Sequence, residues 1–138
     1  MAAKAKLPLI FHCREAADDL IAIIKNNKNQ LPSAVVHCFS QNKEFLKECL
    51  DCGIYVSFTA NITYKKSQGL RDLVKYTPLE SILLETDAPF LAAEPVRGKR
   101  NQPEFLKFLA DEIARIKEMD FDQVARITTA NAKMFFKI

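Results

Sequence analysis

The sequence predicts an α/β fold in which four β-α units place their strands in one parallel sheet. Short apolar segments alternate with longer amphipathic segments along the chain, as in parallel strands covered by helices. Polar residues follow each short segment directly, at the strand ends where such folds bind ligands. The 138 residues suit a single domain spanning 1–138, but a closed α/β barrel needs about 200 residues or more.

The first two units occupy residues 7–53. The apolar segment LPLIF precedes AADDLIAIIKNN, in which Leu20, Ile23 and Ile24 recur at helical spacing. The segment SAVVHCF precedes NKEFLKECLDCG, and Gly53 is expected to end that helix because glycine adopts a left-handed conformation at low cost. The apolar face of this second helix is formed by Phe45, Leu46, Cys49 and Leu50.

The third and fourth units follow the same order. IYVSFT precedes SQGLRDLVKY, whose apolar stripe is formed by Leu70, Leu73 and Val74. SILLE precedes a polar loop and then two helices, which we expect from Pro103 to about Met119 and from Phe121 to about Phe136. Asp120 is the expected N-cap of the last helix.

The composition indicates an ordinary soluble protein. With 49% hydrophobic and 27% charged residues, the chain is not typical of disorder, and its net charge of +3 permits a polyanionic substrate without requiring one. No apolar segment approaches the roughly 20 residues of a membrane span, and no secretory signal is present, so we expect a cytoplasmic protein with no membrane contact. In that compartment the cysteines are expected to be reduced; they are Cys13, Cys38, Cys49 and Cys52.

Metal-ligating side chains gather at the predicted strand ends. The only two histidines, His12 and His37, each follow an apolar strand, and alternation puts Glu85 and Asp87 on one face of the fourth strand. A buried carboxylate needs a cation or a donor, and imidazole with carboxylate suits Zn or Mn. On residues alone, a divalent-metal site and hydrogen-bonded packing histidines both remain open.

A basic loop follows the fourth strand. Arg97, Lys99 and Arg100 lie within four positions. Arg14, Lys65 and Lys66 could join them in a phosphate-binding rim. A solvated surface loop is the alternative. Other chemistries have less support, because the sequence lacks a G-x-S-x-G nucleophile motif and the glycine-rich loops that bind nucleotides.

Several ordered motifs together resemble a known family. PLIFHCREA, VVHCFS, LLETDAPFL, RGKRNQP and ITTANAKMFF occur in that order, and they resemble the C-terminal half of the TatD-type metal-dependent deoxyribonucleases, of the amidohydrolase-like barrel superfamily. The resemblance covers the chain from about Leu7 onward. It implies that the four units correspond to strands five to eight of a TIM (β/α)8 barrel.

The resemblance also implies a metal-dependent hydrolase that cleaves phosphodiester bonds of DNA with a metal-activated water. His12 and His37 would bind one ion of a two-metal centre of Mg, Zn or Mn. Asp87 would bind the other and help position or deprotonate the attacking water. Asp87 and Glu85 are thus the expected catalytic residues, with Glu85 supporting the ligands or contacting the substrate.

Four further residues are expected to meet the DNA. By the same resemblance, Arg14 would contact the substrate or support the metal ligands, and Arg97, Arg100 and Asn101 would shape the loop beside the nucleic-acid path. These four residues are the expected substrate-binding group.

The sequence departs from the family pattern in two metal-binding features. The His-x-His pair of the family's first strand and the glutamate that bridges its two metals are both absent. Four strands also cannot close a barrel of eight, so both sheet edges would be open for self-association or for pairing with a missing N-terminal half. A noncatalytic half-barrel that serves as an assembly module, and a metal-dependent hydrolase of small molecules, are the alternative functions.

Overall fold

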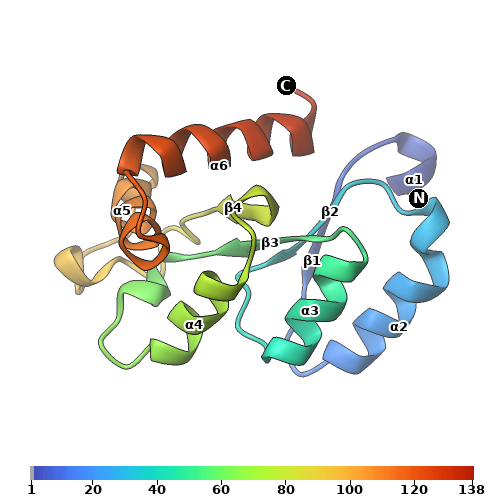
Figure 1. The fold of residues 1–138 in the computed structure, drawn as a ribbon, viewed down its shortest axis with the longest axis horizontal. Coiled ribbons are helices and arrows are strands. Elements are labelled where there is room, and N and C mark those ends of the chain that lie inside the picture. The colour runs from blue at the N-terminus through green and yellow to red at the C-terminus, as the bar shows by residue number, and fades with distance from the viewer. Residues whose placement is uncertain (1) are drawn as a thin grey trace.

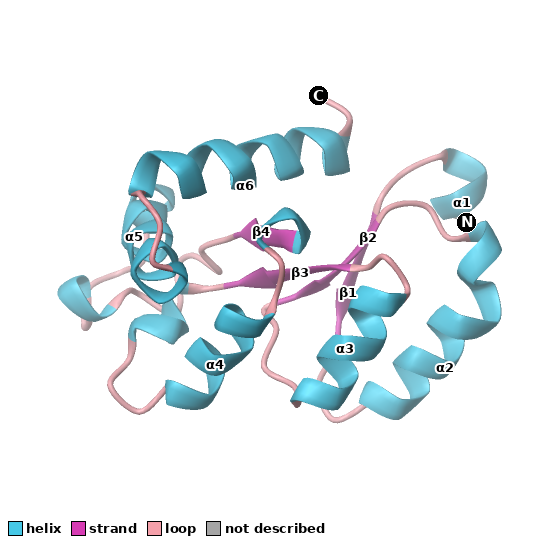
Figure 2. Cartoon of the chain, viewed as in Figure 1, coloured by secondary structure: helices cyan, strands magenta, loops and turns pink. Residues whose placement is uncertain are grey.

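The computed structural model describes residues 2–138, which form an α/β fold around one four-stranded parallel sheet (Figure 1). The strands are β1 (Leu9–His12), β2 (Ala34–His37), β3 (Tyr55–Phe58) and β4 (Ile82–Leu84). Each strand pairs in parallel with its neighbour in the sequence, so the sheet order is β1-β2-β3-β4 (Figure 2). The predicted fold class of four parallel β-α units is confirmed.

The helices connect and cover these strands. They are α1 (Ala2–Ala5), α2 (Ala17–Asn27), α3 (Lys43–Asp51), α4 (Gln68–Tyr76), α5 (Leu106–Lys117) and α6 (Phe121–Phe136). Helices α2, α3 and α4 lie along one side of the sheet, and α6 runs on the other side of β4 (Figure 1). No helix within residues 2–138 combines the length and the apolar character that crossing a membrane requires.

The main core lies between the sheet and its helices. Alternate strand residues, among them Val36, Val56 and Ile82, are buried against helix residues such as Leu46 and Ile113. The period of two along each strand puts these residues on one face and leaves the opposite face to the residues between them.

The opposite face of the sheet is only partly covered. Phe135 of α6 packs with Val35 and Leu83, and its ring meets the Tyr55 ring edge-on at 5.6 Å between centroids. Ile10 lies on this same face at the β1 edge and is 59% exposed. The face toward α2, α3 and α4 is therefore closed, whereas the opposite face is closed from β2 to β4 and open at β1.

One buried amide holds α6 in place. The Asn131 side chain donates hydrogen bonds to the carbonyls of Leu79 and Ile82, at 2.8 and 2.9 Å, just before β4 and at its first residue. Asn131 is 3% exposed, so these bonds are shielded from water.

Two helix predictions need correction. In α2 the buried residues are Ile21 and Ile24, whereas Ile23, expected on the apolar face, is 56% exposed. The helix expected from Pro103 begins as a 3-10 turn, Pro103–Phe105, and α5 then runs only to Lys117. It ends there because Glu118 adopts a left-handed conformation with φ 55°.

The helix termini confirm both predicted end residues, although one of them lacks a capping hydrogen bond. Gly53 has φ 72° just after α3, as expected of a helix stop. Asp120 stands at the N-cap position of α6, but its side chain makes no capping hydrogen bond. At the start of α3, Asn42 is the N-cap, although the sequence analysis did not single it out. Its side chain accepts a hydrogen bond of 2.9 Å from the Phe45 backbone N–H. The four cysteines are free thiols.

Candidate metal centre

The two histidines meet at the carboxyl ends of neighbouring strands. His12 ends β1 and His37 ends β2, and the parallel register pairs these residues directly. Their ring centroids are 5.7 Å apart, with the rings tilted by 35°. His12 is exposed, whereas the His37 side chain is 23% exposed. The expected juxtaposition of the histidines is therefore present.

Glu85 reaches across the end of β3 to contact β2. It follows β4, yet its carboxylate lies 2.9 Å from Nδ1 of His37 and accepts the Cys38 backbone N–H at 2.7 Å. The hydroxyl oxygen of Ser57, which is buried between them, lies 3.3 Å from the same Cys38 N–H. The partner that the sequence requires for this carboxylate is thus a histidine and a backbone donor.

Asp87 lies on the other side of His37. Its Oδ1 is 4.0 Å from Nε2 of His37, which is too long for a direct hydrogen bond. Its backbone has φ 50°, a left-handed conformation that aspartate adopts more readily than most residues. This turn places the carboxylate beside the imidazole instead of further along the strand direction.

These donors fit part of a metal site. Within residues 2–138, no three His, Cys, Asp or Glu side chains stand close enough together to hold an ion. The pair of His37 Nε2 and Asp87 Oδ1 has the right donor types, but in a tetrahedral site two atoms each about 2.1 Å from the ion lie about 3.4 Å apart. The pair can share an ion only if the two atoms approach, and His12 must also turn toward them.

The neighbouring thiol is not built for nucleophilic chemistry. Burial raises the pKa of Cys38, a hydrogen bond from Thr59 opposes this, and the nearby carboxylates of Glu85 and Asp87 raise it further. The Cys38 sulfur lies 3.7 Å from the Thr59 hydroxyl oxygen. A protonated thiol is a weak nucleophile, so Cys38 is poorly suited to act as one beside His37.

Asn101 shapes the loop that carries Asp87. Its side-chain amide donates to the carbonyls of Thr86 and Phe90, at 2.5 and 2.6 Å, and its backbone N–H donates to Pro89. At 3% exposure, Asn101 is enclosed by this loop. Both hydrogens of the Asn101 amide are therefore engaged within the protein, where they hold the shape of this loop.

The basic residues come from two segments, Arg14 from the one after β1 and the others from the one after β4. Arg14 and Arg100 are exposed. Arg97 is also exposed, and its guanidinium lies 4.2 Å from the centroid of the Tyr64 ring and pairs with Glu94 at 3.1 Å. Arg97 is thus partly held by its own loop.

Tyr64 and Glu94 were not singled out from the sequence, although both order this rim. The Tyr64 hydroxyl donates to the Ala92 carbonyl at 3.1 Å, and the Glu94 backbone N–H donates to the Thr63 hydroxyl at 2.9 Å. These bonds tie the loop after β3 to the loop after β4. In the sequence, the only indication was an aromatic residue, Tyr64, next to Lys65, and it did not identify a hydrogen-bond partner.

Comparison with known proteins gives consistent relatives. The family described as TatD related DNase matches residues 1–137. An uncharacterized metal-dependent hydrolase, YabD of Bacillus subtilis, is 40% identical over the whole chain and 54% of its own length. A 3'-5' ssDNA/RNA exonuclease TatD of Edwardsiella piscicida is 36% identical over the whole chain and 55% of its own length.

Solved structures agree in fold. The crystal structure of YJJV, a TatD homologue from Escherichia coli K12, superposes with a TM-score of 0.90 at 28% identity, over 99% of this chain and 52% of the other. A hydrolase of the TatD family from Entamoeba histolytica has a TM-score of 0.84 at 22% identity, covering 96% and 51%. The chain therefore spans about half the length of the relatives that it matches.

Proposed function

The chain belongs to the family of TatD-related DNases, and from that membership we propose that it forms part of a metal-dependent phosphodiesterase acting on nucleic acid. Relatives named as metal-dependent hydrolases support the general chemistry. The relative named as a 3'-5' ssDNA/RNA exonuclease supports a single-stranded nucleic acid as the substrate, and the family's description as a DNase supports DNA.

The observation that carries the proposal is the meeting of His37 and Asp87 at one end of the sheet, 4.0 Å apart and beside His12. These three residues would hold the divalent ion, Mg²⁺, Mn²⁺ or Zn²⁺. When bound, such an ion supplies Lewis-acid chemistry, which acidifies water and stabilises the charge of a phosphoryl group under attack. Asp87, exposed at 37% of its side chain, can also accept a proton from a water molecule in the open end of the site.

The basic rim would hold the phosphate backbone. The exposed guanidinium groups of Arg14, Arg97 and Arg100 offer paired N–H donors that match phosphate oxygens. Asn101 would act indirectly, by fixing the loop from Thr86 to Phe90 on which Asp87 sits.

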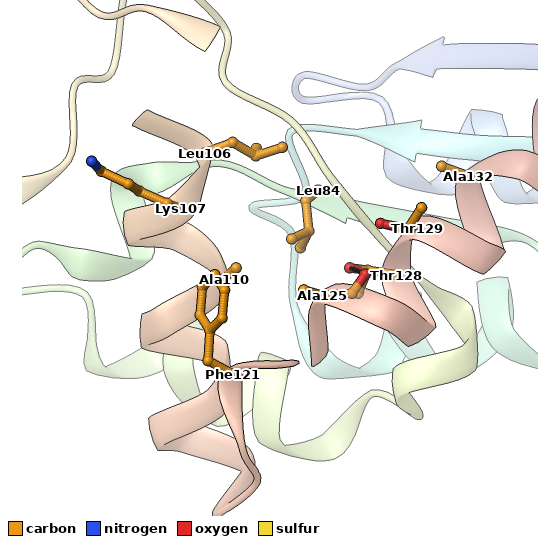
Figure 3. Close-up of a pocket in the computed structure, with 9 residues that line it drawn as sticks. All are labelled: Leu84, Leu106, Lys107, Ala110, Phe121, Ala125, Thr128, Thr129 and Ala132. Carbon is orange, nitrogen blue, oxygen red and sulfur yellow. Dashed lines mark hydrogen bonds between the residues drawn. The ribbon is translucent and has the colours of Figure 1, made fainter. Parts of the chain in front are cut away.

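We propose that the two open edges of the sheet, at β1 and β4, are interfaces with a further half made of β-α units. A cavity of about 230 Å³ lies beside β4, between α5 and α6, and is lined by apolar residues that include Leu84, Leu106 and Ala125 (Figure 3). A second cavity of about 360 Å³ lies beside β1, where Leu9 and Phe11 meet α2. The relatives are about twice as long as this chain, and we propose that a further half of this kind would cover both cavities.

Nuclease activity is tested with labelled single-stranded DNA, RNA and duplex DNA in the presence of each ion. The chain is assayed alone and mixed with the first half of the Bacillus subtilis relative. We expect chelator-sensitive cleavage in the mixture, with a loss of at least about 100-fold in His37→Ala and Asp87→Ala. Cleavage that survives both substitutions, or no cleavage by a folded mixture that binds the ion, would contradict the proposal.

The proposed interface beside β4 is tested by analytical ultracentrifugation of the same mixture. We expect a one-to-one complex that Ala125→Lys weakens, because this residue lines the cavity beside β4. The matched control is Ala130→Lys, an exposed position on the same helix outside that cavity. A dimer of this chain that the added half does not displace would identify a second copy as the occupant instead.

A further inference from the structure

The Glu85 carboxylate uses both of its oxygens on one short segment of β2. Oε2 lies 2.9 Å from Nδ1 of His37, and Oε1 accepts the backbone N–H of the next residue, Cys38, at 2.7 Å. The Glu85 side chain is 25% exposed, so both contacts are partly shielded from water. Two short contacts to adjacent residues fix the carboxylate in direction as well as in position.

The contact with His37 decides where the imidazole carries its proton. An ionised carboxylate can only accept hydrogen bonds, so Nδ1 must be the donor. The other nitrogen, Nε2, then has no hydrogen in the neutral ring and presents its lone pair on the side of Asp87, 4.0 Å away. Only a nitrogen without a hydrogen can coordinate a metal.

The contact with Cys38 fixes the base of the same ring. Cys38 has φ 47°, a left-handed conformation that costs free energy for a residue with a side chain. Its N–H is turned into the site, where the charged Oε1 of Glu85 holds it and the Ser57 hydroxyl lies further off at 3.3 Å. The backbone turn after His37 and the orientation of its ring therefore depend on one carboxylate.

We propose that Glu85 is the positioning residue of the site: it holds His37 in the tautomer with the proton on Nδ1 and points Nε2 toward Asp87. The purpose of this arrangement rests on the proposed metal site. The arrangement itself is a property of the metal-free chain, so it can be tested separately.

Glutamine at position 85 separates this role from simple packing, because it has the same shape with one acceptor fewer. The backbone N–H of Cys38 can only donate, so the amide oxygen of the Glu85→Gln variant must face it. The NH2 group then faces His37, Nδ1 becomes an acceptor, and the proton moves to Nε2. A residue that only ties β4 to β2 would leave the tautomer unchanged.

The first test is nitrogen NMR of the metal-free chain at a pH where the imidazoles are neutral. The chain has two histidines, so His12→Asn assigns the His37 signals. We expect the wild-type His37 ring to carry its proton on Nδ1 and Glu85→Gln to carry it on Nε2. A wild-type ring protonated on Nε2, or a Glu85→Gln ring still protonated on Nδ1, would overturn the proposal. The wild-type result stands even where the variant folds poorly.

Ser57→Ala is the matched control. It removes the weaker contact to the same Cys38 N–H and leaves the carboxylate in place, so the tautomer should not change. Zinc affinity, measured by competition with a coloured chelator, should fall by roughly 10- to 100-fold in Glu85→Gln and much less in Ser57→Ala. A wild-type chain that shows the Nδ1–H tautomer but binds no zinc would reject the metal site and keep the positioning role.

Discussion

At the scale of single residues, one buried amide determines the shape of the loop that carries Asp87. Asn101 donates to two carbonyls of this loop, those of Thr86 and Phe90, while its own carbonyl oxygen accepts the Gln102 backbone N–H. A buried amide with its donors and acceptor all engaged defines one loop conformation, because every other conformation leaves polar groups without partners.

Asn101→Ala should destabilise the fold by about 1–3 kcal/mol, because it removes a buried amide and leaves two partly buried loop carbonyls without donors. Urea unfolding measures this change. The control is Asn27→Ala, in which an exposed amide loses one bond to the Ile23 carbonyl, and a change below about 0.5 kcal/mol is expected. Equal losses of stability in the two variants would argue against this role of the Asn101 hydrogen bonds.

Cys49 should make the fold sensitive to alkaline pH. Burial raises the pKa of the Cys49 thiol to about 12 from its ordinary value of 9.0, and the residue is 0% exposed. Above about pH 9 the unfolded thiol loses a proton that the folded thiol keeps, so the free energy of unfolding falls as the pH rises toward 12. Urea unfolding from about pH 8 to about pH 11 measures the slope, and Cys49→Ala should flatten it.

The sequence predicted which site residues lie close together, but not the hydrogen bonds that link them. His12, His37 and Asp87 follow strands whose carboxyl ends lie together in any parallel sheet, so their juxtaposition followed from alternation and strand order. That Glu85 would cross β3 to reach Cys38 depends on a left-handed backbone turn. No residue type in the sequence marks that turn, since Cys38 is not a residue that favours it.

At the scale of elements, the helix starts differ in how they are capped. Asn42 accepts the Phe45 backbone N–H at the start of α3, whereas Asp120 has the cap position of α6 without the capping bond. Residue type and position alone did not separate these two cases, because a cap also requires the side chain to turn back onto the helix.

Asn42→Ala should therefore cost about 1 kcal/mol of stability, and Asp120→Ala should cost less, since only its favourable charge near the helix start is lost. Thermal and urea unfolding of the two variants measure the difference. A larger loss in Asp120→Ala would mean that its side chain caps α6 in solution.

The error in α2 also has a physical reason. Ile21, Ile23 and Ile24 all fit a helical apolar pattern, and the pattern does not say which side meets the sheet. The structure buries Ile21 and Ile24 and exposes Ile23 beside the open edge at β1, where it lines a cavity. Ile23 therefore lies at the open β1 edge, and the helical pattern alone does not show what would cover it.

At the scale of the whole molecule, the segment after β4 carries both Asp87 and the exposed Arg97 and Arg100, so the proposed binding to nucleic acid should depend on salt. Arg100→Gln should weaken binding to single-stranded DNA and lower the slope of log affinity against log salt by about 0.7. Fluorescence anisotropy across a salt series measures this.

The control for that series is Arg115→Gln, at the other end of α5, where Glu112 already engages the guanidinium. It should leave the slope unchanged. A slope near zero for the wild-type chain would favour the alternative of a small neutral substrate.

The strand order has a consequence for how the chain folds. Each strand pairs only with strands adjacent to it in the sequence, so every pairing closes a loop of one β-α unit. Short loops cost little chain entropy, and native contacts between near neighbours favour fast folding. The sheet can therefore grow by one strand at a time through these local pairings. The Asn131 side chain then joins α6 to the start of β4.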